Sequence, residues 1–314
     1  MDVVTIGETM ALFTSDSTIR YGGSFSKKLG GAESNVAIGL TRLGYSVGWV
    51  SRLGNDELGK FILSFIRGEG IDVSQVSIDK HAQTGIYIKE LRHAADVRVQ
   101  YYRKFSAASY MSEEDLDEEY LSKAKYLHLT GITPALSESA YKMTLKAIEI
   151  AKKNGTKIIF DPNIRQKLWS KDLAKEVLLQ IALQSDIFLP GLSEATFLTD
   201  EEQPEKIGEY FRNRGVSIVV MKDGEKGAYY STNKEFHHVP GFYVKNVIDP
   251  VGAGDGFAAG FISGLLDKLS IHEAVERGNA VGALVTMVNG DFEGLPYREE
   301  LERFLNHNDV DVSR

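Results

Sequence analysis

Short apolar runs alternate with longer amphipathic stretches along most of this 314-residue chain, and no other feature constrains its fold as strongly. Strands that alternate with helices usually pair in parallel, because each crossover helix returns the chain to the same end of the sheet. The sequence therefore predicts one α/β domain over residues 1–314, a three-layer α/β/α sandwich with a mainly parallel central sheet. Buried strands are predicted for residues 3–7, 47–51, 126–130, 157–161, 186–189 and 217–221, and helices for residues 33–43, 58–67, 137–153, 171–183, 253–266 and 271–287.

Two stretches, about 10–25 and 84–105, break this rhythm and contain strand patterns without intervening helices. Residues 85–89 and 97–103 alternate roughly in period two, which is typical of strands with one exposed face. Short strands set apart from an α/β core predict a small β-sheet lid over the active site. A surface hairpin of no functional consequence is the alternative.

The charge balance and the lack of cysteine exclude several classes of function. There are 36 Lys and Arg residues against 44 Asp and Glu, a formal net charge of −8, so a general nucleic-acid binder is disfavoured. An acidic substrate must be held by local arginines. The absence of cysteine rules out disulfides and thiolate nucleophiles. No leader pattern and no long apolar run is found, so we expect a cytoplasmic protein without membrane contact.

Two glycine-containing turns are candidates for binding phosphate. Gly54–Lys60 matches the P-loop pattern through its lysine, but Phe61 follows where that motif needs Ser or Thr for magnesium. A β-to-α turn with Asn55 or Asp56 as the helix cap explains this segment better.

The second turn, Gly252–Gly256, precedes a predicted helix rich in small residues. Glycines let the backbone approach an anion, and a helix start offers unpaired N–H groups and the positive end of the dipole. A carboxylate at position 255 would repel a phosphate that is merely bound. It suits a base that takes a proton from a hydroxyl attacking phosphorus. A glycine-packed helix start without function is the alternative.

Two signatures about 220 residues apart resemble those of the ribokinase (PfkB) sugar kinases, and the likeness runs over essentially the whole chain. The first is Gly30-Gly31-Ala32-x-x-Asn35-x-Ala37 and the second is Asp249-x-x-Gly252-Ala-Gly-Asp255-x-Phe257-x-x-Gly260. The resemblance implies a ribokinase-like fold, with Asp255 as catalytic base and Gly252, Ala253 and Gly254 as the anion hole. It also implies that Gly31, Ala32, Glu33, Ser34 and Asn35 contact the phosphoryl acceptor.

The same resemblance implies ATP and Mg²⁺ and leaves a monovalent cation open. Lys222-Asp-Gly224-Glu-Lys-Gly227 looks like the nucleotide loop of the family. The residues implied for nucleotide binding are Asn163, Arg165, Lys222, Gly224, Gly227, Gly252, Gly254 and Asn279. Glu194 lies in Gly191-Leu-Ser-Glu194, where many members have Asn-x-x-Glu near the metal. Because the asparagine is missing, an effect of Glu194 on the metal through water is expected, and a helix-start role is the alternative.

The acceptor is suggested by tyrosines and arginines. Tyr101 and Arg103 share one face of a predicted strand, Tyr87 can lie beside them, and Arg165 ends Asp161-Pro-Asn-Ile-Arg165 after a parallel strand. Two arginines and two tyrosines suit a carboxylate better than a neutral sugar. With Asp291, these positions closely resemble 2-keto-3-deoxygluconate kinases, which implies a sugar-acid substrate. Three alternatives stay open: Arg103 is an exposed strand residue, the tyrosines only pack the lid, or Arg165 binds nucleotide phosphate.

Two other functions stay open at this point. One is a fructokinase or ribokinase acting on a neutral sugar, and the other is a catalytically silent sugar or nucleotide sensor on the same fold. An exposed lid edge also favours pairing with the lid of another copy, so a homo-oligomer is expected.

Overall fold

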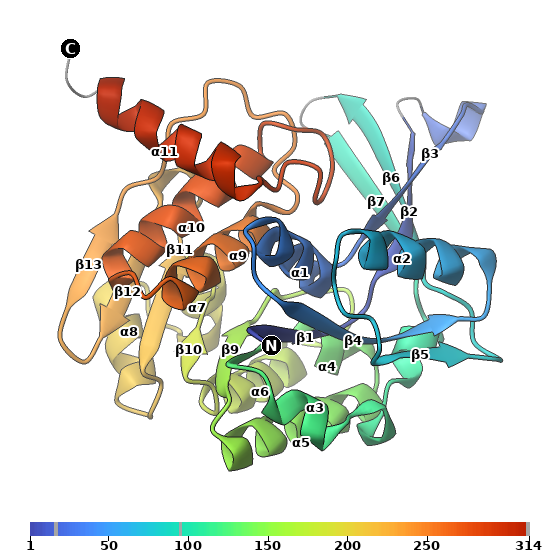
Figure 1. The fold of residues 1–314 in the computed structure, drawn as a ribbon, viewed down its shortest axis with the longest axis horizontal. Helices are drawn as coiled ribbons and strands as arrows, with labels where there is room; N and C mark the ends of the chain where they lie inside the picture. The colour runs from blue at the N-terminus through green and yellow to red at the C-terminus, as the bar shows by residue number, and fades with distance from the viewer. Residues whose placement is uncertain (16–17, 94–95, 312–314) are drawn as a thin grey trace.

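The computed structural model describes residues 1–15, 18–93 and 96–311 and contains two sheets (Figure 1). The larger sheet has nine strands in the order β13-β12-β11-β10-β9-β8-β1-β4-β5. Pairing is parallel from β11 through to β5, whereas β12 and β13 are antiparallel additions at one edge. The strands are β1 (Val3–Ile6), β4 (Val47–Gly54), β5 (Val76–Asp79), β8 (Tyr126–Thr130), β9 (Lys157–Asp161), β10 (Ile187–Phe188), β11 (Ile218–Lys222), β12 (Ala228–Thr232) and β13 (Phe236–Val239).

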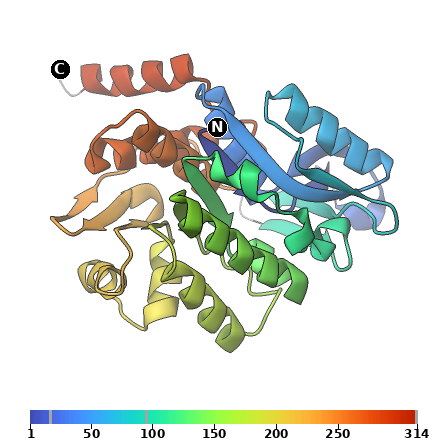
Figure 2. The same cartoon turned by 60° about the horizontal axis from the view of Figure 1, so that its bottom comes forward.

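Helices cover both faces of this sheet, each over its own apolar core (Figures 1 and 2). One core contains side chains of α1 (Ala32–Arg42), α2 (Glu57–Gly68), α9 (Ala253–Leu266), α10 (Ile271–Val285) and α11 (Arg298–Asp311). The other contains side chains of α3 (Glu118–Ser122), α5 (Glu138–Asn154), α6 (Lys171–Ala182), α7 (Leu192–Thr199) and α8 (Pro204–Arg212), and α4 (Ile132–Leu136) packs on α5. The predicted three-layer α/β/α sandwich is confirmed.

The smaller sheet forms the predicted lid, in the strand order β3-β2-β6-β7. Its strands are β2 (Met10–Ser15), β3 (Ser26–Gly30), β6 (Ile86–His93) and β7 (Asp96–Tyr102). Only β2 and β6 pair in parallel. The prediction placed the first part of the lid at 10–25, which is too short. β3 lies beyond it, because its first residues are polar and exposed and give no alternating apolar signal.

Most predicted elements lie within one or two residues of their observed bounds. The predicted helix at 271–287 ends two residues earlier, and α3, α4, α8, α11, β5, β12 and β13 were not predicted. In the segment Gly54–Lys60, Asp56 caps α2, as predicted in place of a P-loop. Its carboxylate accepts hydrogen bonds from Gly59 N and from Thr84 N, both at 2.8 Å. Within the described ranges, no helix combines the length and apolarity needed to cross a membrane.

The parallel strands end at one edge of the sheet, and the strand order reverses direction at β1. From β1 the chain goes to β4 on one side and later to β8 on the other. Ligands of open α/β sheets bind outside the carboxyl ends at such a point. The lid stands over this edge (Figure 1).

Candidate active site

A cavity of about 370 Å³, the lid cavity, lies between the carboxyl ends of the strands and the inner face of the lid. Three kinds of element contribute to it: residues at strand ends, residues on lid strands, and the first turns of α1 and α9. Its predicted members are Gly31, Ala32, Asn35, Tyr87, Tyr101, Arg103, Asn163, Arg165, Glu194, Lys222, Gly252, Gly254, Asp255 and Asp291. The sequence signals therefore converge on one place, although they come from positions more than 250 residues apart.

The floor of the lid cavity is the N-terminal turn of α9. Gly252 is its N-cap with φ +82°, and a Cβ there would lie 2.0 Å from the carbonyl oxygen of Asp291, so only glycine fits this turn. Asp255 lies in the first helical turn and accepts a hydrogen bond at 2.8 Å from Asn35 Nδ2. The other amide atom, Asn35 Oδ1, is buried and has no partner among the described residues, so it is free to accept from a ligand hydroxyl.

Burial raises the pKa of the Asp255 carboxyl to about 7. The hydrogen bond from Asn35 opposes this rise, as do the charges of Arg165 and Lys222, while the nearby Asp161 carboxylate adds to it. A carboxylate with a pKa close to the working pH can take a proton and release it again. Asp255 is therefore a buried carboxyl that can gain or lose a proton near neutral pH.

One wall of the lid cavity consists of aromatic and cationic side chains. Tyr87 and Tyr101 pair across β6 and β7 and stack with ring centroids 5.6 Å apart. The guanidinium of Arg103 lies 5.6 Å from the centroid of the Tyr101 ring. Arg103 is only 8% exposed and forms an ion pair with Glu8, so its interpretation as an exposed strand arginine is wrong. Its Nε has no partner in the described part of the chain.

A second group of charges joins the lid to the body of the protein. Tyr87 donates a hydrogen bond of 2.5 Å to Asp291, which follows α10. Lys89, two residues further along β6, pairs with Asp249 and lies 3.5 Å from Asp291 Oδ1. Burial raises the pKa of Asp291, although Tyr87 and Lys89 act to lower it.

A third group lies at the ends of β9, β10 and β11. Lys222 Nζ is 2.5 Å from Asp161 Oδ2. Burial acts to lower the pKa of Lys222, but the negative charges of Asp161 and Glu194 outweigh it, so the pKa is raised. Glu194 accepts from Gly191 N at 2.8 Å and from Ile164 N at 2.7 Å. The helix-start role, which was the alternative for Glu194, is thus present. Glu194 also holds the loop that leads to Arg165, an exposed residue of the same cavity.

A second cavity of about 600 Å³, the glycine-loop cavity, lies beside the first, between the loop after β11 and helices α9 and α10. It is lined by the predicted Lys222, Gly224, Gly227, Ala253, Gly254 and Asn279, and by apolar side chains of the segment 242–247. Gly227 has φ +99°, and a Cβ there would lie 2.1 Å from Val239 O. Asn279 donates to Val239 O at 3.1 Å and Pro240 O at 3.0 Å, which holds the turn over α10.

Two predicted residues do not line either cavity. Glu33 is fully buried and accepts hydrogen bonds from Thr130 and Thr133 at 2.5 and 3.0 Å, and the Ser34 hydroxyl donates to Gly31 O. Only one face of α1 can turn towards the cavity, and that face carries Ala32 and Asn35. The prediction that Glu33 and Ser34 contact the acceptor is therefore wrong in this structure.

Sequence reasoning missed Glu8, Met10 and Lys89, all of which line the lid cavity. Glu8 follows β1 directly, so the strand-end rule could have found it. Lys89 lies two residues after Tyr87 and therefore on the same strand face. A lysine on a strand with one exposed face is ordinarily found on the solvent side, whereas Lys89 is 1% exposed.

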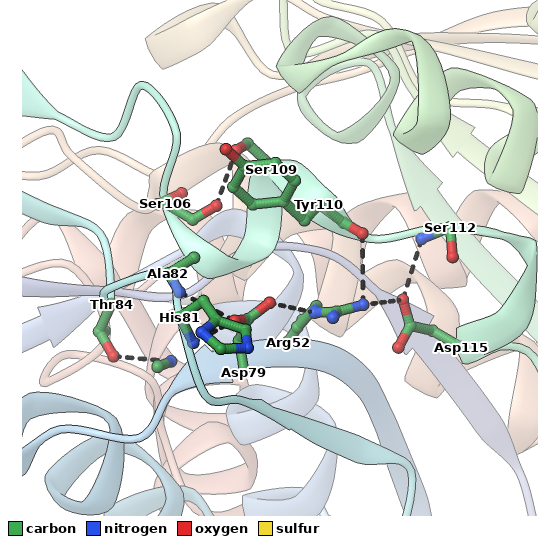
Figure 3. Close-up of polar contacts among 11 residues, drawn as sticks. Arg52, Asp79, His81, Ala82, Thr84, Ser106, Ser109, Tyr110, Ser112 and Asp115 are labelled. Atoms are coloured by element: carbon green, nitrogen blue, oxygen red, sulfur yellow. Dashed lines mark hydrogen bonds and ion pairs between the residues drawn. The ribbon is translucent and has the colours of Figure 1, made fainter.

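The outer face of the lid borders a third hollow, the lid groove, of about 1420 Å³. Phe13, Ile86, Ile88 and Tyr102 line it from the lid, alternating along the strands with the residues of the inner face. Figure 3 shows polar contacts among residues in and next to this groove, where Arg52 donates to Asp79 at 2.9 Å and to Asp115 at 3.4 Å. This groove is apart from the two cavities that meet at Asp255.

Comparison with known proteins agrees with this geometry. The model of the pfkB family carbohydrate kinases matches residues 1–298. The 2-dehydro-3-deoxygluconokinase of Bacillus subtilis (strain 168) is 45% identical over 98% of this chain and 96% of its own length. A solved 2-dehydro-3-deoxygluconokinase from Thermotoga maritima has a TM-score of 0.89 at 28% identity and covers 97% of this chain and 98% of its own. A putative ribokinase II from E. coli, solved in complex with ATP and Mg²⁺, has a TM-score of 0.91 at 28% identity, with 98% and 99% covered. The chain belongs to the pfkB family of carbohydrate kinases.

Proposed function

We propose that this kinase transfers the γ-phosphoryl group of ATP to the terminal hydroxyl of 2-keto-3-deoxygluconate. Asp255 takes the hydroxyl proton, the hydroxyl oxygen bonds to the γ-phosphorus, and the bond from that phosphorus to the bridging oxygen of ADP breaks. The products are the 6-phosphate of the sugar acid and ADP, with the proton on Asp255. Positioning and charge stabilisation supply most of the rate enhancement in reactions of this type.

The observation that carries this proposal is the junction of the two cavities. The lid cavity and the glycine-loop cavity share Lys222, Pro250 and Gly254 in their linings. Asp255 follows directly, at the start of α9, where the N–H groups of Gly252, Ala253 and Gly254 can stabilise the transferring group. A hydroxyl in one cavity and a triphosphate entering from the other would meet at this turn.

A sugar acid is favoured over a neutral sugar by the charges of the lid cavity. Arg103 and Arg165 offer guanidinium groups that can bind a carboxylate, and Tyr87 and Tyr101 place rings and hydroxyls beside them. Asn35 Oδ1 has no hydrogen-bond partner among the described residues, and Asp291 Oδ1 makes only the 3.5 Å contact with the Lys89 ammonium, so both can accept from sugar hydroxyls. The relatives from Bacillus subtilis and Thermotoga maritima are both named as kinases of this same acid.

The residues present fit Mg²⁺ that arrives with ATP. Among the described residues, no group of three or more His, Cys, Asp and Glu side chains is arranged to hold a metal ion. Mg²⁺ at phosphoryl-transfer sites is bound largely by phosphates and water, with one or two carboxylates. Asp161 and Glu194 line the lid cavity beside Lys222 and can supply these contacts, Glu194 through water. The bound ion would neutralise phosphate charge.

The test is a panel of acceptors with ATP and Mg²⁺: 2-keto-3-deoxygluconate, fructose and ribose. We expect the sugar acid to give a kcat/KM at least about tenfold above either neutral sugar, because a guanidinium–carboxylate hydrogen bond contributes roughly 1.5–3 kcal/mol. Faster phosphorylation of fructose or ribose would identify a neutral-sugar kinase. Binding of ligands without any transfer would identify a sensor.

We also infer that a second copy of this chain covers the lid groove, giving a homo-oligomer. Tyr102 and Phe105 are 60% and 67% exposed there, and β3 and β7 are edge strands of the lid. Exposed apolar surface next to open strand edges favours association. Sedimentation of the wild type should give at least a dimer, and Tyr102→Asp with Phe105→Asp should give a monomer. A wild type that is monomeric at micromolar concentration would contradict this inference.

A further inference from the structure

Lys89 is a buried lysine on a lid strand, and the proposed reaction gives it no role. Its side chain is 2% exposed and points from β6 into the molecule, on the same face as Tyr87. The ammonium group pairs with Asp249 and lies 3.5 Å from Asp291 Oδ1, and both aspartates belong to the body of the protein. Lys89 therefore joins the lid to the body through charge.

The two aspartates lie on either side of the turn that begins α9. Asp249 Oδ1 accepts a hydrogen bond of 3.1 Å from Val251 N, which fixes the turn from one side. The carbonyl oxygen of Asp291 packs against Gly252 from the other side, where a Cβ would come within 2.0 Å of it. The conformation of the anion hole thus depends on where these two carboxylate residues lie.

Two buried carboxylates this close to one ammonium group need that positive charge. The side chains of Asp249 and Asp291 are 3% and 8% exposed, so water screens their repulsion poorly. Removing one partner of a buried ion pair leaves uncompensated charge in the interior. Without Lys89, Asp249 or Asp291 would have to move or be protonated, and the turn at 250–252 would follow.

We propose that Lys89 is a positioning residue, an internal cation carried by the lid that holds the anion-hole turn in its productive conformation. Docking of β6 onto the body would then complete the phosphoryl-transfer site as well as close the lid cavity. This inference rests on the proposed function, because it assigns a purpose to the turn before Asp255. It differs from substrate binding, since the described contacts of the Lys89 ammonium are with carboxylates of the protein.

Turnover and binding of Lys89→Met give the first test, with Lys27→Met, an exposed lysine on β3, as the control. We expect kcat to fall about 10²-fold, the loss typical of a displaced catalytic group, while the Kd values for the sugar acid and for ATP change less than about threefold. The control should keep wild-type kcat. An unchanged kcat in Lys89→Met, or a loss confined to sugar-acid affinity, would overturn the proposal.

Chemical rescue separates positioning by charge from a merely structural role. Lys89→Ala leaves space next to Asp249 and Asp291, so added ammonium or methylammonium should raise the kcat of this variant at least about tenfold. Tetramethylammonium at equal ionic strength should not raise it. Equal effects of the three salts would overturn the proposal. Should these variants fail to fold, Lys89→Met with Asp249→Asn removes the ammonium and one of its two carboxylates, which costs less stability than leaving both carboxylates unpaired. Its kcat should stay below that of the wild type because Asp291 still lacks its cation, and a wild-type kcat would overturn the proposal.

Hydrogen exchange gives a readout that needs no turnover. In Lys89→Met, amides of the segment 249–256 should exchange faster than in the wild type, while those of α10 should not change. Unchanged exchange at 249–256 would overturn the role of Lys89 even if the enzyme acts on another sugar. A wild type that phosphorylates nothing in the acceptor panel would defeat the proposed function, and the exchange result would still decide the role of Lys89.

Discussion

The two cavities that meet at Asp255 are built by different means. The lid cavity is lined mostly by charged and polar side chains from strand ends and from the lid, and many of them are buried and paired. The glycine-loop cavity is shaped by backbone at Gly224, Gly227 and Gly254 and by apolar side chains. Single side chains should therefore decide which acceptor binds, whereas nucleotide binding should respond mainly to changes that move the backbone.

The largest effect should come from the boundary between the two cavities. Asp255→Asn keeps the shape but cannot accept the hydroxyl proton, so turnover should fall by roughly 10²–10⁴-fold with modest changes in the affinity for ATP and sugar acid. Steady-state kinetics and calorimetry measure the two quantities. Asp200→Asn is the matched control, because Asp200 is an exposed helix cap in a left-handed conformation that asparagine also adopts. Near-normal turnover of Asp255→Asn would show that Asp255 is not the base.

Arg103→Ala should act on the lid cavity alone. Loss of a guanidinium–carboxylate contact should weaken sugar-acid binding about 10²-fold and leave ATP binding unchanged. Because this substitution also leaves Glu8 buried without its partner, the double variant with Glu8→Gln separates lost binding from lost stability. Arg165→Ala should likewise weaken acid binding. Unchanged acid affinity in both single variants would point back to a neutral hexose.

The pH profile should follow the carboxyl of Asp255, the proposed base, which lines the lid cavity. Burial raises the pKa of Asp255 to about 7, and only the deprotonated carboxylate can accept a proton. The kcat/KM of the wild type should therefore be level above that pH and fall about tenfold per unit below it. A profile that stays level down to pH 5 would mean that this carboxyl is not raised or does not act as the base.

The smallest effect is expected in the glycine-loop cavity. Asn279→Ala removes the two hydrogen bonds that tie Val239 and Pro240 to α10, so the cavity wall should loosen and the Kd for ATP should rise about three- to tenfold. Sugar-acid affinity should stay the same when measured without nucleotide. A larger change in the Kd for the sugar acid than in the Kd for ATP would contradict the proposal that the glycine-loop cavity binds the nucleotide and the lid cavity binds the acid.

The parts of the site that could be predicted are those with a local cause. The turn at Gly252–Gly256 needs glycine and a helix start, and both are visible in consecutive residues. Tyr87, Tyr101 and Arg103 follow from strand periodicity once a lid is assumed. The strand rhythm likewise predicted the main sheet, because its apolar runs are continuous and its helices are long.

The parts that could not be predicted depend on partners distant in sequence. Nothing near Lys89 shows that Asp249, 160 positions later, will accept its charge. Glu33 lies inside a signature segment, and only the packing of α1 against Thr130 and Thr133 shows that its carboxylate turns away from the cavity. The antiparallel edge formed by β12 and β13 also escaped prediction, because both strands are short and the middle of β13 is exposed.

The parallel pairing of β2 with β6 also bears on how the chain assembles during synthesis. Ala11 pairs with Ile86, so β2 emerges from the ribosome long before its neighbour and cannot complete the lid until residues 86–93 follow. Pairings between segments so far apart close large loops and form slowly. β2 and β3 therefore form a hairpin before β6 is available, with the apolar side chains of Leu12 and Phe13 uncovered, and nascent chains can pair wrongly during this interval.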